Sequence, residues 1–191
     1  RKALGCVWNE EVYEKALSLE LQNRGMQVEP QKEFEVFYFD KQVGKYRIDL
    51  LVNDTIIVEL KVVPKVFPLH QAQLISYLKG YDKPLGMLVN FGGKELYYRI
   101  FPNKVSQLTA LKDQFDFEKV TIPHKEQLRE LLVTANRVLI TLGPGYFHQV
   151  YRRAWYYELK TAGADLEVVQ EIAAQYQNQV LGSRKVFFFK M

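Results

Sequence analysis

The sequence predicts an α/β protein with a mixed β-sheet and helices packed on it. Segments rich in Glu, Leu, Lys and Ala and free of Gly and Pro alternate with short runs of β-branched and aromatic residues. One predicted helix lies between strands, which implies a crossover connection and so a mixed sheet with helices packed on it. We expect the order α-β-β-β-α-β-β in the first hundred residues.

Each element of this order has a local signal. The first helix ends at Gly25 and the second lies between Pro68 and Gly80, while Asp40–Gly44 and Asn53-Asp54 are typical of turns. The predicted elements are helix 8–24, strands 34–39, 46–52 and 55–62, helix 69–79, and strands 85–91 and 95–101.

The chain also contains an internal repeat. At a constant offset of 138, positions 4–44 share 12 identities with positions 142–182, where chance gives about two or three. A period this long predicts a duplicated domain rather than a solenoid. We expect a first domain at 1–103, a helical connector at 104–141 and a degenerate partial repeat at 142–191.

The second half has its own element signals. Pro123 is typical of a helix start, and an apolar stripe follows it at Leu128, Leu131, Leu132, Ala135, Val138 and Leu139. Residues 146–162 repeat the first helix, and the tail 185–190 reads as a strand.

Composition excludes several classes of protein. No apolar run approaches the roughly 20 residues that cross a bilayer, and the single cysteine, Cys6, excludes an intrachain disulfide. A reducing cytoplasm is the expected compartment. Residues 1–103 carry 14 basic and 13 acidic side chains, a weak charge for a nucleic-acid binder. An argument that the protein acts on DNA must therefore rest on the chemistry of a site and not on its overall charge.

Candidate site chemistry lies on two neighbouring strands. Glu59 and Lys61 point to one face because side chains alternate along a strand, and a turn at Asn53-Asp54 would place Asp49 beside Glu59. Two neighbouring carboxylates on apolar strands favour a divalent cation, and oxygen ligands favour Mg²⁺ or Mn²⁺. The alternative is a solvated strand edge with a surface aspartate.

Two predicted helices add polar side chains. On the first, Glu10 and Glu20 share an arc with Tyr13 and Leu17, although the helix dipole alone would also explain Glu10. On the second, Gln73 and Tyr77 are one turn apart and face the same way. The alternative for that pair is a surface Gln beside a partly buried Tyr.

Taken together, these residues resemble the PD-(D/E)XK nuclease superfamily, with Gln73-x-x-x-Tyr77 similar to its RecB-type branch. The closer resemblance is to the bacterial GxxExxY proteins, where Val7 replaces the Gly while Glu10 and Tyr13 fit the motif. The second copy has Gly145 and Tyr151, but His148 takes the place of the Glu. The resemblance implies a restriction-endonuclease-like αβββαβ core.

The resemblance also implies an activity, namely Mg²⁺-dependent hydrolysis of DNA phosphodiester bonds. Asp49, Glu59, the Leu60 carbonyl and Glu10 would bind the metal, and Lys61 would orient or activate water. Gln73 and Tyr77 would position the phosphate or support Lys61. The alternative is a catalytically inactive interaction or nucleic-acid-binding module.

The second copy cannot repeat this chemistry. At the same offset, Asp49 corresponds to Phe187 and Glu10 to His148. We therefore expect residues 142–191 to be a structural or docking partner. The two copies would pack together, or the chain would dimerise.

Overall fold

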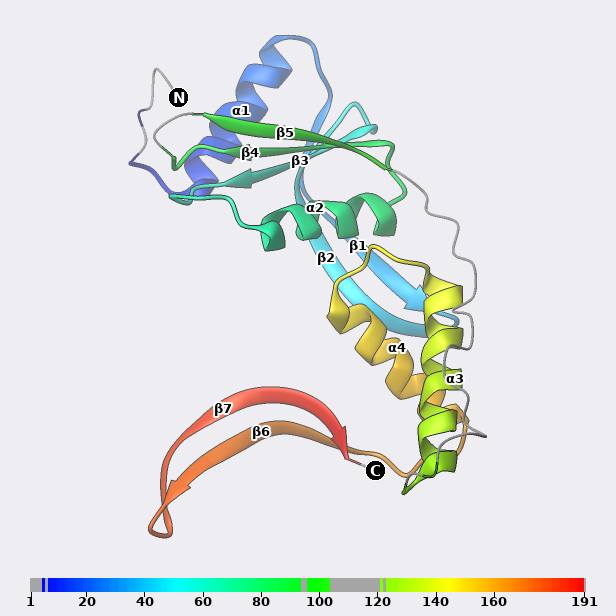
Figure 1. Cartoon of the computed structure of the whole chain (residues 1–191). Coiled ribbons are helices and arrows are strands. Elements are labelled where there is room, and N and C mark those ends of the chain that lie inside the picture. Colours follow the sequence, from blue (N-terminus) through cyan, green and yellow to red (C-terminus); the bar gives the residue numbers. More distant parts are fainter. Residues whose placement is uncertain (1–4, 6, 94–95, 104–120, 122, 191) are drawn as a thin grey trace.

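The computed structural model describes residues 5, 7–93, 96–103, 121 and 123–190, and only the backbone of residues 187–190. Figure 1 shows the arrangement of its elements in space. The elements in chain order are α1 (Glu10–Asn23), β1 (Val28–Tyr38), β2 (Lys41–Val52), β3 (Ile56–Lys61), α2 (Pro68–Gly80), β4 (Leu85–Asn90), β5 (Tyr97–Pro102), α3 (Lys125–Leu142), α4 (His148–Thr161), β6 (Glu167–Tyr176) and β7 (Gln179–Lys190).

The first five strands form one mixed sheet in the order β1-β2-β3-β4-β5. Only β3 and β4 run parallel, and α2 makes the crossover between them. The other three neighbouring pairs are antiparallel. The predicted α/β class, the order of elements and the mixed sheet are confirmed.

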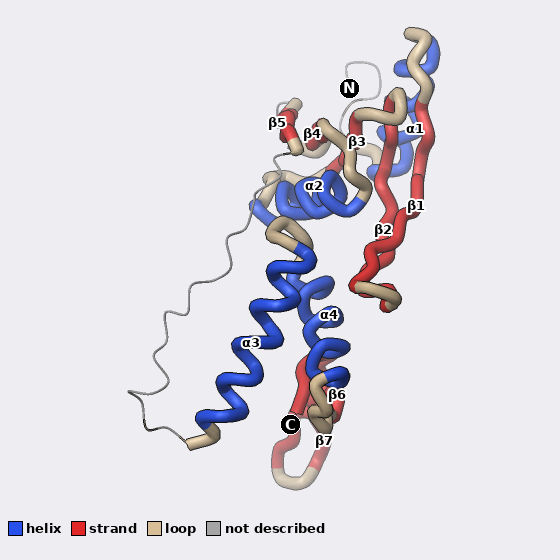
Figure 2. Tube along the Cα trace, turned by 90° about the vertical axis from the view of Figure 1, so that its right-hand side faces the viewer, coloured by secondary structure: helices blue, strands red, loops and turns tan. Residues whose placement is uncertain are grey.

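Helices cover both faces of this sheet, because alternate residues of β3 contribute to two separate cores (Figure 2). Ile57 packs in the core that includes Leu74 of α2. Val58 and Leu60 pack in the other core, with Tyr13 of α1. The polar residues Glu59 and Lys61 therefore belong to the face on which α2 lies.

Local signals explain where the two flanking helices begin. Asn9 caps α1, since its Oδ1 accepts a hydrogen bond of 3.3 Å from the backbone N–H of Val12. Pro68 opens α2, where a missing backbone N–H costs nothing. Predicted and observed bounds agree within two residues for both helices.

The first hairpin is longer than the sequence predicted. β1 begins at Val28 rather than Phe34, and β2 begins at Lys41 rather than Tyr46. The predicted turn Asp40–Gly44 is wrong in position, because the chain reverses around Phe39, which has a φ of 51°. A bulge beside Val36 absorbs the extra residue, so that Val43 and Gly44 continue the strand.

The second half forms a helix pair and a separate hairpin. β6 and β7 pair only with each other among the described strands. The strand predicted at 185–190 is the end of the longer β7, and its partner β6 was not predicted as a strand. Of the expected connector, residues 104–120 and 122 lie outside the described residues, and α3 begins at Lys125.

None of the described helices combines the length and apolar character that crossing a membrane requires.

Candidate active site

Asp49 occupies the point where β2 and β3 separate. Paired residues of these strands end at Leu50 and Val58, and the next rung would place Asp49 opposite Glu59. Instead of a backbone rung, Oδ2 of Asp49 accepts a hydrogen bond of 2.7 Å from the N–H of Leu60. Because the N–H and C=O of a strand residue share a direction, the Leu60 carbonyl also faces this gap.

Glu59 is a buried carboxylate in which only one of the two oxygens has a partner among the described residues. Its side chain is 1% exposed, and Oε1 forms an ion pair of 2.6 Å with Nζ of Lys61. Its Oε2 has no hydrogen-bond partner among the described residues. Burial, followed by the charge of Asp49, raises the pKa of Glu59 to about 8 against the opposing effect of Lys61.

Lys61 is the cation that these acids share. Burial would lower its pKa, but the charges of Glu59, Glu10 and Asp49 outweigh burial and raise it. Its ammonium therefore stays protonated at neutral pH. It lies 3.9 Å from Oε1 of Glu10, at the start of α1.

Glu10 brings a third carboxylate to the end of β3. Burial raises the pKa of Glu10, and Asp49 adds to the rise, while Lys61 and a hydrogen bond from the backbone of Val62 lower it. The start of α1 therefore sits over the point where β3 ends.

Gln73 and Tyr77 lie on α2 and contact each other directly. Nε2 of Gln73 donates a 2.8 Å hydrogen bond to the hydroxyl of Tyr77. Tyr77 is buried and packs edge-on against Phe34. Burial and then the charge of Glu59 raise the pKa of Tyr77 to about 12. The charge of the candidate site therefore acts on the hydroxyl of Tyr77, although the ring of Tyr77 packs in the core.

A buried asparagine holds the backbone that follows Lys61. Oδ1 of Asn90 accepts hydrogen bonds from the N–H groups of Val63 and Gly92, at 3.0 and 3.1 Å, and its Nδ2 donates to the carbonyl of Val63 at 2.8 Å. A Cβ on Gly92 would meet the nitrogen of Val63 at 2.5 Å, so this close approach requires glycine. The end of β3 is therefore fixed against β4.

Sequence reasoning missed Glu14, one turn after Glu10. It is buried, accepts a hydrogen bond from Nε2 of Gln31, and its pKa is raised by burial and then by Asp49. The i+4 spacing from Glu10 was the available signal. Glu20 was expected to share the face of Tyr13 and Leu17. Its side chain is instead exposed and forms an ion pair of 2.7 Å with Arg24.

The donors at this site fit a hard divalent cation. Asp49, Glu59 and the Leu60 carbonyl are oxygen ligands, and the unpartnered buried Oε2 of Glu59 is an oxygen that a cation would satisfy. Within the described part of the chain, no group of three or more His, Cys, Asp or Glu side chains forms a ready-made metal site. Asp49, Glu59 and the Leu60 carbonyl are thus the central donors that this geometry offers, with the Glu10 carboxylate nearby.

Comparison with known proteins identifies the family. The sequence model of the PD-(D/E)XK nuclease superfamily matches residues 1–100 and 125–188. The chain belongs to the PD-(D/E)XK nuclease superfamily. Its five-stranded mixed sheet with flanking helices is consistent with the restriction-endonuclease-like fold of that superfamily, and membership suggests a nuclease-like function.

Two further comparisons add little to the superfamily assignment. No curated protein matches the sequence. One solved structure, described as the crystal structure of SSO0001, is 21% identical with a TM-score of 0.42, over 51% of this chain and 52% of that chain. The chain therefore spans about half the length of that protein.

Membership in the PD-(D/E)XK superfamily also bears on the metal. Its nucleases generally use divalent metal ions, in agreement with the oxygen donors of Asp49 and Glu59. The second-half position equivalent to Glu10 is His148, which lines a groove between α3 and α4 with Trp155. The side chain of Phe187 lies outside the described residues.

Proposed function

We propose that the protein is a metal-dependent nuclease that hydrolyses DNA phosphodiester bonds at the ends of β2 and β3. The observation that carries the proposal is the buried Oε2 of Glu59, which lacks a partner among the described residues and lies beside the carboxylate of Asp49. Burying such an oxygen costs free energy, so its retention favours a ligand. Superfamily membership supports the same reaction class.

In this proposal, different residues of the chain bind the metal, orient the water and position the phosphate. Asp49, Glu59, the Leu60 carbonyl and Glu10 would hold Mg²⁺ or Mn²⁺. A bound divalent cation supplies an activated water and stabilises the charge that develops on phosphate. Lys61, protonated at neutral pH, orients the water or a phosphate oxygen. Gln73 and Tyr77 position the phosphate from α2 or support Lys61.

The test of this assignment is Asp49→Asn. The amide oxygen can still accept the hydrogen bond from Leu60, so the fold should persist while the negative charge is lost. We expect Mg²⁺-dependent cleavage of labelled DNA to fall by more than about 100-fold with an unchanged circular dichroism spectrum.

A matched control is Asp54→Asn, which changes a solvent-exposed carboxylate at the β2–β3 turn. It should cut as the parent does. An Asp49→Asn protein that cleaves DNA at the parental rate would overturn the assignment. Parallel assays with RNA and with single-stranded DNA define the substrate.

A second candidate function is a catalytically inactive interaction or nucleic-acid-binding module. Two observations favour it, namely the near-neutral charge of residues 1–103 and the lack of a three-ligand group among the described residues. Calorimetric titration with Mn²⁺ separates the two candidates. Heat that disappears in Asp49→Asn supports the nuclease, whereas no heat and no shift in melting temperature support the inactive module.

A further inference from the structure

Within the chain, α4 packs on the β1–β2 hairpin. Val150 and Ala154 of α4 are fully buried in the core that also contains Tyr38 and Val43 of the hairpin. These two hairpin residues are 2% and 0% exposed. The outer part of the hairpin is therefore covered by a helix from the second half of the chain.

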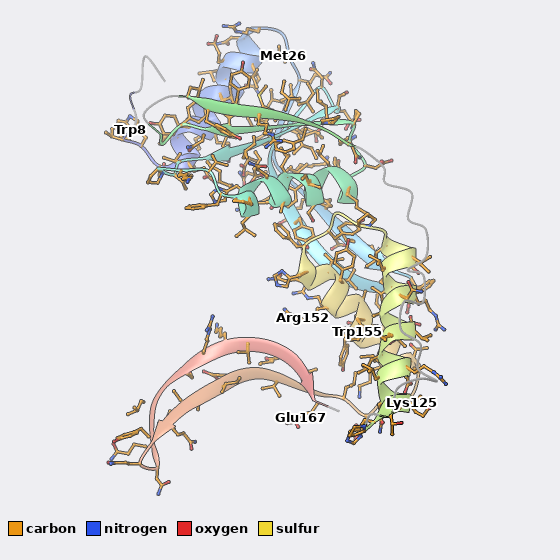
Figure 3. All side chains as sticks on the ribbon, viewed as in Figure 1. Trp8, Met26, Lys125, Arg152, Trp155 and Glu167 are labelled. Carbon is orange, nitrogen blue, oxygen red and sulfur yellow. The ribbon has the colours of Figure 1, made fainter. Side chains whose placement is uncertain are left out.

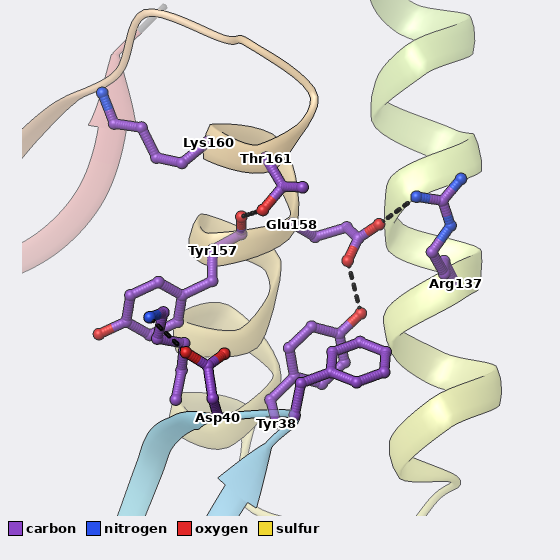
Figure 4. A pocket seen from close by; sticks show the side chains of 9 residues that line it. Tyr38, Asp40, Arg137, Tyr157, Glu158, Lys160 and Thr161 are labelled. Carbon is purple, nitrogen blue, oxygen red and sulfur yellow. Dashed lines mark hydrogen bonds and ion pairs between the residues drawn. The ribbon is translucent and has the colours of Figure 1, made fainter.

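Polar groups fix the orientation of this contact (Figure 4). The hydroxyl of Tyr38 donates a 2.7 Å hydrogen bond to Oε2 of Glu158, and Arg137 of α3 pairs with the other oxygen of that carboxylate. Nη1 of Arg153 donates a 3.2 Å hydrogen bond to the carbonyl of Val43. A buried tyrosine–glutamate pair is satisfied only in one docking geometry.

Both partners of this contact recur in the chain at the offset of the sequence repeat. α1 and α4 begin and end 138 positions apart, and β7 begins and ends 138 positions after β2. The bulge beside Val36 recurs beside Ala174. The repeat thus extends to strand register, which supports a duplicated unit.

A hydrogen bond between residues eight positions apart recurs as well. The hydroxyl of Tyr13 donates to the carbonyl of Gly5 at 2.8 Å, and that of Tyr151 donates to the carbonyl of Gly143 at 2.6 Å. The same anchor therefore fixes the segment that precedes each helix.

α1 exposes part of the face that α4 buries. This face adjoins the arc of Tyr13 and Leu17 that packs on the sheet. Leu19 on it is 59% exposed, whereas Val12 and Ala16 are partly buried. Its chemistry matches that of α4 position by position: Val12, Lys15, Ala16, Leu19 and Glu20 correspond to Val150, Arg153, Ala154, Tyr157 and Glu158. Valine, a cation, alanine, a large apolar residue and glutamate recur in order.

The β6–β7 hairpin exposes the residues that β1–β2 buries. Ile172, Tyr176 and Leu181 are 47%, 63% and 68% exposed, whereas their counterparts Phe34, Tyr38 and Val43 are 7%, 2% and 0% exposed. The hairpin stands apart from the main sheet (Figure 3). The chain thus exposes a helix surface on α1 and a hairpin surface on β6–β7, which correspond to the two surfaces that meet where α4 packs on β1–β2.

We propose that α1 of one copy of this chain docks on the β6–β7 hairpin of a second copy, in the geometry of the internal contact between α4 and β1–β2. Glu20 then accepts a hydrogen bond from the hydroxyl of Tyr176, and Lys15 donates to the carbonyl of Leu181. Arg24, which already pairs with Glu20, takes the role of Arg137. The occupant is a second copy, because α1 carries identical or chemically similar side chains at the five positions by which α4 covers the equivalent hairpin.

Light scattering and sedimentation velocity over a range of concentrations test the contact. The parent chain should exceed the 22.4 kDa of a monomer as concentration rises. Ala16→Arg and Leu19→Arg on α1, or Leu181→Asp on β7, should each give monomers. Leu69→Asp changes an exposed apolar residue of α2 and should associate as the parent does. Melting curves establish that each variant is folded.

Mixing two defective variants gives the sharper test. Leu19→Arg retains a usable hairpin and Leu181→Asp retains a usable α1, so the mixture should form a complex that neither forms alone. Tyr176→Phe should weaken association at least about tenfold, while Tyr38→Phe should not. A parent chain that stays monomeric, or association that persists in both defective variants, overturns the proposal.

Discussion

At the scale of single residues, Glu59 carries an electrostatic cost that its neighbours only partly offset. Its carboxylate is buried beside Asp49, and one ammonium serves both acids as well as Glu10. Lys61 pairs with one oxygen and leaves the other without a partner among the described residues. Such an arrangement favours protonation or a bound cation.

The raised pKa of Glu59 predicts how stability depends on pH. Glu59 binds its proton more tightly in the folded state, at a pKa of about 8 against an ordinary 4.5. Its contribution to stability is therefore fully present below about pH 4.5 and is lost as pH rises through 8. In chelator-treated protein, urea unfolding should show the free energy of unfolding falling across this range, and less so in Glu59→Gln.

An equal slope in the Glu59→Gln protein and the parent would contradict this assignment. The matched control is Glu33→Gln, which changes an exposed carboxylate paired with Lys45. The pKa of Glu33 is lowered by that pairing rather than raised. Its removal should leave the fall in stability above pH 5 unchanged.

At the scale of elements, the site depends on where β3 ends. β2 and β3 stop pairing at Leu50 and Val58, and Asp49 fills the gap that opens. On the other side of β3, Asn90 of β4 ties down the backbone at Val63. Asp49 therefore takes the place of a β2–β3 rung, and Asn90 holds the chain after the β3–β4 ladder ends at Lys61. Together they fix the part of β3 that carries Glu59 and Lys61.

Asn90→Ala tests this role. The change leaves the partly buried N–H and C=O of Val63 without their side-chain partner, at a cost of roughly 1–3 kcal/mol in the free energy of unfolding. Urea denaturation measures this loss. Asn103→Ala removes a single hydrogen bond to Leu78 and should cost less. Equal losses in the two variants would argue against a special role for Asn90.

Element types were largely predictable, because their signals are local. Gly25 and Pro68 mark helix ends and β-branched runs mark strands, so the bounds of α1, α2, β3, β4 and β5 lie within two residues of prediction. The extent of β1 and β2 was not predictable. The segment around Glu29 and Pro30 lacks a strand signal, and it extends only because the facing strand supplies its ladder.

At the scale of the whole molecule, the second half of the chain completes the core of the first. α3 and α4 cover the outer part of the β1–β2 hairpin, where Tyr38 and Glu158 meet. The superfamily sequence model matches residues in both halves. α3 and α4 therefore belong to the same folded unit as the main sheet, because their side chains share its core.

A double-mutant cycle measures this long-range contact. Tyr38→Phe and Glu158→Gln should each destabilise the protein, and the double variant should cost less than the sum of the two. We expect a coupling energy of roughly 1–3 kcal/mol, because the hydrogen bond joins a buried hydroxyl to a carboxylate. Tyr176→Phe in the uncovered hairpin should leave monomer stability unchanged. Additive effects of the first two changes would show that the side chains are not coupled.

The sequence alone determined the order of elements in the first hundred residues, the repeat, and the placing of Asp49 near Glu59, since alternation along strands and a short turn are local properties. Tertiary structure alone decided that Glu14 rather than Glu20 faces the sheet, and that one hairpin is covered while its counterpart is exposed. Those outcomes depend on which faces meet across the chain. Such packing is set by apolar burial between segments more than a hundred residues apart, which no local pattern encodes.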